Sequence, residues 1–206
     1  VNILYRVGAR NENPARTGFA HLFEHLMFRG TRAVENFDLP VQMASGDNNA
    51  FTNNDYTDFY ITLPKDNLET ALWLESDRME GLDITPAKLE AEKKVVIEEF
   101  RQRYLNQPYG DQTMLLRALA YKVHPYRWAA IGLATDHIAG ATLADVESFY
   151  RAHYRPSNAI LSISADMEEE WMLELAEKWF APLADHPSET AAIPQEPMQT
   201  QARRQE

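Results

Sequence analysis

Hydrophobic and polar positions change period several times along the chain, and these changes predict a protein built from both strands and helices. Alternation of apolar and polar residues, bounded by turn residues, predicts strands at residues 1–8, 50–53, 56–63 and 158–164. Apolar residues that recur every three or four positions predict helices at residues 19–28, 40–45, 64–79, 85–105, 111–122 and 168–180, and one more that begins at a Thr142 cap. Strands and long helices in irregular order predict an α+β fold with a mixed or antiparallel sheet flanked by helices.

Turn residues mark the boundaries of these elements. Gly46–Asn49 is typical of a turn between the short helix and the first strand of a hairpin. Pro86 stands at the first turn of the long helix, a position that proline favours. From Asp185 onward Pro, Gln and charged residues dominate and the periodicity disappears. We therefore expect one domain over residues 1–185 and a linker over residues 186–206 that leads toward a following domain.

Composition and charge exclude several classes of protein. The 206 residues are 45% hydrophobic and 25% charged, which is typical of a globular protein with a real core. No apolar stretch is long enough to span a bilayer, so we expect a soluble protein. The sequence does not identify its compartment, and a bacterial cytoplasm or periplasm is compatible with it. The formal net charge of −11 repels phosphate backbones and argues against a nucleic-acid partner. Because the chain has no cysteine, disulfides, thiolate metal ligands and a cysteine nucleophile are excluded.

A short motif in the first predicted helix carries the clearest chemistry. Residues 21–25 read His-Leu-Phe-Glu-His, and residues four apart in a helix project from one face. The imidazoles of His21 and His25 can therefore bind one zinc ion. Glu24 lies beside them, where its carboxylate can take a proton from a water at the metal. This residue order is the inverted zinc-peptidase motif, although buried histidines that only pack in a core are the common alternative.

Two glutamates of the long predicted helix provide a candidate third ligand. Glu92 and Glu99 are seven residues apart and lie nearly in line on a helix face that also carries Val95 and Val96. Glu98, about 100° around the helix, is the more natural solvent residue. We expect Glu99 to complete the zinc site and Glu92 to orient a ligand or the attacking water without touching the metal. A solvated charged surface is the alternative for these glutamates.

Residues 16–31 resemble the signature block of the pitrilysin and insulinase metallopeptidases, a family that includes the β-subunit of the mitochondrial processing peptidase. The resemblance covers nearly the whole chain. Glu99 follows His25 at the separation that the family's third ligand has, and Glu92 matches another functional glutamate of the family. The resemblance implies a zinc-dependent endopeptidase with one zinc ion per chain, acting on peptides or small unfolded proteins.

A second block also resembles the family. Residues 46–52 are similar to its edge-strand segment, where a substrate peptide adds to the sheet as an extra strand. The resemblance implies that Asn49, Ala50 and Phe51 contact the substrate through backbone hydrogen bonds at an open edge. From the residues alone, an ordinary hairpin with Asn at its turn positions is the expectation.

The resemblance covers only the first, metal-bearing domain of a family whose members are clamshells of two related halves. The distal half supplies an arginine and a tyrosine that help to bind substrate and stabilise the transition state, and no segment of this chain matches them. We therefore expect the chain to bind zinc but to hydrolyse peptides poorly without following domains or a separate partner half.

Two other functions have to be weighed for such a sequence. A non-catalytic binding or assembly subunit of a family complex is one alternative, but such subunits lose motif residues, and here His21, Glu24, His25 and Glu99 are all present. S-ribosylhomocysteine lyase also carries the motif on a similar fold. That enzyme needs cysteine at its metal and active site, and this chain has none.

Overall fold

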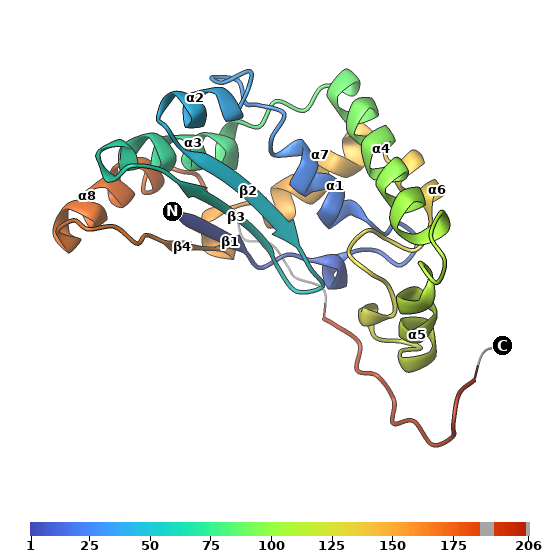
Figure 1. Cartoon of the computed structure of the whole chain (residues 1–206). Coiled ribbons are helices and arrows are strands. Elements are labelled where there is room, and N and C mark those ends of the chain that lie inside the picture. The colour runs from blue at the N-terminus through green and yellow to red at the C-terminus, as the bar shows by residue number, and fades with distance from the viewer. Residues whose placement is uncertain (186–191, 205–206) are drawn as a thin grey trace.

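A four-stranded antiparallel sheet lies at the centre of the computed structural model, which describes residues 1–185 and 192–204 (Figure 1). The strand order is β2-β3-β1-β4, with β1 at Asn2–Tyr5, β2 at Asp47–Thr52, β3 at Thr57–Thr62 and β4 at Ala159–Ser162. The N-terminal strand β1 is central because it pairs with both β3 and β4. Strand β2 lies at one edge and pairs with β3. The sheet and its helices confirm the predicted α+β class.

Helices flank this sheet, and most of them match the predicted elements. Their bounds are α1 Phe19–Leu26, α2 Asp38–Met43, α3 Leu68–Gly81, α4 Pro86–Phe100, α5 Gln112–Ala120, α6 Thr135–Ala139, α7 Leu143–His153 and α8 Glu169–Phe180. The long predicted helix ends in a π-helical turn at Arg101–Leu105. None of the helices in the described part of the chain is long and apolar enough to cross a membrane.

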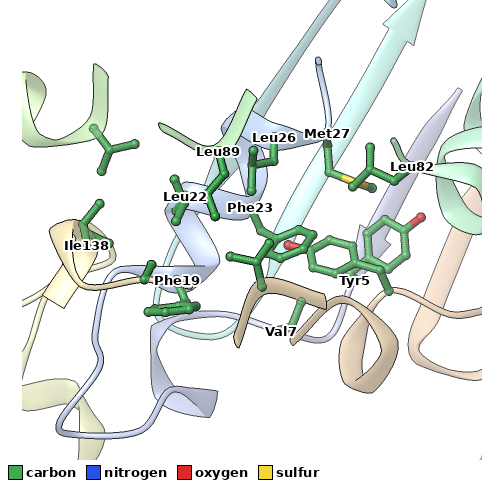
Figure 2. Close-up of a cluster of buried hydrophobic side chains, with 14 of the residues drawn as sticks. Tyr5, Val7, Phe19, Leu22, Phe23, Leu26, Met27, Leu82, Leu89 and Ile138 are labelled. Carbon is green, nitrogen blue, oxygen red and sulfur yellow. The ribbon is translucent and has the colours of Figure 1, made fainter. Parts of the chain in front are cut away.

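The core forms where α1 packs between the sheet and the helices α4 and α7. Leu22, Phe23 and Leu26 are buried on one face of α1, and Figure 2 shows them in a cluster with Tyr5 of β1 and Leu89 of α4. Each such side chain contributes roughly 1.5–3 kcal/mol by leaving water. Helix α1 is thus fixed by its apolar face, and His21, Glu24 and His25 lie on its other faces.

The entry to α1 requires a glycine. Gly18 is the N-cap residue and has a φ of 92°, in the left-handed region that glycine favours. A Cβ at this position would lie 2.7 Å from the carbonyl oxygen of Ile131 and 2.7 Å from Cδ1 of Ile138. Both the backbone angle and the close packing therefore exclude other residues at the start of the motif helix.

Two predicted elements differ from the structure. The predicted turn at 46–49 is wrong, because Asp47, Asn48 and Asn49 already pair with Thr62, Ile61 and Tyr60 of β3. An edge strand with exposed positions tolerates polar residues, so composition alone gave no strand signal there. The five-residue helix α6 was not predicted, since it is too short to show a helical period.

The segment 192–204 has no helix or strand and lies against the end of α5. The Glu196 carboxylate accepts hydrogen bonds from the backbone N–H groups of Lys122, Val123 and His124. Arg203 donates to the carbonyl oxygens of Leu119 and Ala120. Of the linker predicted at 186–206, residues 186–191 and 205–206 lie outside the described residues, and its role remains a prediction.

Candidate active site

The candidate site forms where α1 and α4 face each other across a cavity. His21, Glu24 and His25 project from α1 into this cavity, and His21 is 9% exposed. Helix α4 buries Leu89, Glu92 and Val96 at helical spacing, and the side chain of Glu99 on this side is 28% exposed. Two helices far apart in the sequence thus present histidines and a carboxylate to the same space.

The three predicted metal ligands converge. Nε2 of His21 lies 3.5 Å from Oε2 of Glu99, and Nε2 of His25 lies 3.8 Å from the same oxygen. All three ligand atoms lie within 4.8 Å of one another. Ligands at about 2.0–2.1 Å from a tetrahedral zinc ion stand about 3.3–3.4 Å apart, so the spacing is close to that of a zinc site.

The hydrogen bonding of these atoms also fits a metal. Oε2 of Glu99 is buried and has no hydrogen-bond partner among the described residues. A buried carboxylate oxygen without a partner is costly, and a cation removes that cost. Burial, together with the charges of His25 and Arg103, lowers the pKa of His21 to about 3, so its ring is neutral, as a metal ligand must be.

Glu92 contacts the ring nitrogen of His25 that does not face Glu99. One of its oxygens lies 3.1 Å from Nδ1 of His25, which leaves Nε2 directed at Glu99. The other oxygen of Glu92 accepts hydrogen bonds from Arg29. Burial raises the pKa of Glu92, but the bonds from His25 and Arg29 outweigh it, and the net shift is downward. The arrangement is that of a carboxylate which orients a metal-binding histidine.

Glu24 lies beside the three converging atoms and lines the same cavity. Burial raises the pKa of its carboxyl group, and a hydrogen bond with the Thr52 side chain partly offsets this. A carboxyl group with a raised pKa accepts a proton near neutral pH and can also release it. The geometry therefore allows Glu24 the part of a general base.

The edge strand β2 forms another wall of this cavity, whose volume is about 1480 Å³. The predicted substrate residues Asn49, Ala50 and Phe51 all line it together with the motif residues. The Ala50 N–H donates to Oδ1 of Asn49 at 2.8 Å, so it is directed to the open edge and not to β3. The Asn49 side chain thus occupies a backbone donor that a substrate strand would use.

Several residues at the site escaped the sequence prediction. Arg29 follows His25 by four residues, beyond the end of α1 at Leu26, and its contact with Glu92 spans 63 residues of sequence, so no local spacing predicted it. Arg103, on the π-helical turn, has its Nη2 4.0 Å from Oε2 of Glu99 and lines the cavity. Val95 was expected on the inner face with Val96, but it is 40% exposed while Val96 is buried.

Two histidines in an inverted motif, a distant glutamate and a neighbouring carboxylate are the residue set of a zinc metallohydrolase. The sequence model of the family described as Insulinase (Peptidase family M16) matches residues 1–129. A second model, described as Peptidase M16 inactive domain, matches residues 140–206. The chain belongs to the peptidase M16 family, which confirms the resemblance seen in the sequence.

Several similar proteins and structures are named as proteases or peptidases. The chain is 35% identical over 207 residues to the zinc protease PqqE of Helicobacter pylori, covering 98% of this chain and 46% of that protein. It is 25% identical to the mitochondrial-processing peptidase subunit beta of Caenorhabditis elegans, covering 94% of this chain and 42% of the relative. The crystal structure of a protease from Helicobacter pylori superposes with a TM-score of 0.87 at 35% identity, covering 96% of this chain and 47% of that one. The chain spans about half the length of these relatives.

Proposed function

We propose that this chain is the metal-bearing part of a zinc-dependent endopeptidase that hydrolyses peptides or small unfolded proteins. The observation that carries the proposal is the convergence of His21, His25 and Glu99 beside Glu24 in one cavity. Membership of the peptidase M16 family and the names of the zinc proteases among its relatives support it.

The residues divide the chemistry between them. His21, His25 and Glu99 would hold the zinc ion, which supplies a Lewis acid that polarises the scissile carbonyl and acidifies a water molecule. Glu24 accepts the proton of the water and donates it to the leaving amine. Glu92 keeps the His25 ring in the orientation that directs Nε2 toward Oε2 of Glu99, and these two atoms would both hold the zinc ion.

The substrate would add to β2 as a further strand. Such addition needs an extended backbone, which favours peptides and unfolded segments over folded domains. Ala50 offers an N–H at the open edge, and Asn49 and Phe51 flank it on a strand that lines the same cavity as Glu24. This placement would bring the scissile bond of a paired peptide to the candidate zinc ligands.

We also propose that the whole protein is longer than this chain. Residues 1–185 would be its zinc-binding domain, and 186–206 would lead to following domains or to a separate partner half that completes substrate binding. The coverage of less than half of each relative's length supports this view. The chain alone would then bind zinc and hydrolyse peptides slowly.

Metal analysis tests the proposal directly. Replacing His21, His25 or Glu99 by Gln should remove stoichiometric zinc, because two remaining ligands bind the ion weakly. Glu24→Gln should retain zinc and lower peptide hydrolysis by the full-length protein about a thousandfold or more. Full hydrolysis by Glu24→Gln would refute the role of the base, and full zinc content in the ligand variants would refute the site.

A further inference from the structure

Glu12 is a buried acid outside the cavity, 6% exposed, directly after the short 3₁₀ turn Ala9–Asn11. Its carboxylate accepts three N–H hydrogen bonds. Oε1 accepts from the backbone of Ala20 at 2.8 Å, and Oε2 accepts from the backbone of Gly18 at 2.9 Å and from Nε1 of Trp128 at 3.1 Å. Among the described residues it forms no ion pair, so these donors are what stabilises a carboxylate at this depth.

Two of the three donors belong to the start of the metal-site helix. The first turn of any helix leaves backbone N–H groups without partners inside the helix. Gly18, the N-cap of α1, has no side chain that could accept from them. Glu12 therefore replaces the missing cap from six residues earlier in the chain, and it also joins α1 to Trp128, whose Nε1 donates to the carbonyl oxygen of Ala9 as well.

The residue after Ala20 is His21, one of the candidate zinc ligands. The other end of α1 is held by Glu92, which contacts His25 and Arg29. Carboxylates thus contact both ends of the helix: Glu12 accepts from the backbone just before His21, and Glu92 contacts the His25 ring itself. Zinc–ligand distances tolerate only about 0.2 Å of deviation, so small movements of the first turn would take Nε2 of His21 out of range.

We propose that Glu12 is a positioning residue that fixes the first turn of α1 and with it His21, and so sets the affinity of the site for zinc. The inference rests on the proposed function, because it needs the His21, His25 and Glu99 cluster to bind zinc. It assigns Glu12 no contact with substrate or metal.

Variants of Glu12 should fold, because another set of contacts holds the same region. The Thr17 N–H donates to Nδ1 of His137 at 3.1 Å, and the Leu133 N–H donates to Oγ1 of Thr17 at 2.8 Å. Removing the Glu12 carboxylate then loosens the turn without releasing it. Glu12→Gln places an amide NH₂ where Gly18, Ala20 or Trp128 directs an N–H, so it disturbs the turn at nearly constant size.

The test is a competition titration with Zn²⁺ and a chromophoric chelator on the chain and its variants. Burial raises the pKa of Glu12 to about 8, so the titration is run at pH 8.5, where the ionised form of Glu12 predominates over the protonated form. We expect Glu12→Gln to raise the Kd for zinc about tenfold and Trp128→Phe, which removes one donor, to raise it about threefold. The visible absorption band of the Co²⁺-loaded protein should shift in both variants.

The control is Glu75→Gln, which alters another buried acid, on α3, whose partner is Arg78. It should lower the melting temperature and leave the Kd for zinc unchanged. If Glu12→Gln also lowers only the melting temperature, the positioning role is overturned and the zinc site stands. A wild-type chain that binds no zinc overturns the proposed function, and the role of Glu12 with it.

Discussion

On the α1 and α4 side of the cavity, polar side chains are held by other residues, whereas on the β2 side the side chains of Asn49 and Phe51 are exposed. His25 is oriented by Glu92, and Glu92 is held by Arg29. Phe51 is 44% exposed, and within the described part of the chain the Asn49 side chain bonds only to the neighbouring backbone. A metal needs ligands fixed within fractions of an ångström, while a substrate strand needs an edge that is free to pair. Zinc binding and peptide binding should therefore be separable by mutation.

The two sides share the core behind α1, and a pH change should affect both together. The His153 ring packs on Phe149, which in turn packs on Phe19 and Phe23 of α1. Burial lowers the pKa of His153 to about 4, against 6.5 for the exposed group. Between these values the unfolded chain binds more protons than the folded one, so stability falls as the pH drops from about 6.5 to 4.

We expect about 2 kcal/mol of the loss in unfolding free energy between pH 7 and pH 4.5 to come from His153. His153→Phe keeps a ring against Phe149 and removes the proton site. Urea unfolding of the wild type and this variant at both pH values measures the difference. Equal losses in the two proteins would show that His153 does not control the acid response of the shared core.

The second prediction separates the two sides of the cavity by a change in the edge strand β2 alone. Ala50→Pro removes the N–H that β2 directs outward, and proline is tolerated on an edge strand where no ladder bond is lost. We expect an unfolded fluorescent peptide to bind the zinc-loaded Glu24→Gln protein about tenfold more weakly when Ala50→Pro is added, because a backbone hydrogen bond and the approach of the strand are lost. Zinc content should not change.

The matched control for this experiment is Asn49→Ala. It frees the Ala50 N–H from the side chain that occupies it, so peptide binding should stay equal or become tighter. If Ala50→Pro also removes zinc, the two sides are coupled and the comparison fails. If peptide binding is unaffected by Ala50→Pro, the substrate does not pair with this edge.

The sequence predicted residues at a helical period better than residues whose contacts follow no period, for a physical reason. Histidines four apart and glutamates seven apart have positions dictated by helix geometry, so His21, His25 and Glu99 could be placed on converging faces. The role of Glu12 could not be predicted, because its carboxylate bonds to backbone N–H groups and to the Trp128 indole, and no sequence period relates these positions. The start of β2 was missed since polar residues such as Asp47 gain their strand conformation from pairing with β3 and not from their own propensity.

The smallest effect should come from Arg29, which contacts Glu92 and reaches the candidate ligand His25 only through it. Its guanidinium donates to Glu92, but the Arg29 side chain is 48% exposed, so water can replace part of the interaction. We expect Arg29→Gln to weaken zinc binding about threefold, below the effect of removing a direct partner of a ligand, with peptide binding to β2 unchanged. Arg32→Gln, at an exposed arginine three residues further on, is the control and should leave the Kd for zinc unaltered. Equal zinc affinities for the Arg29 and Arg32 variants would mean that Glu92 orients His25 without help from Arg29.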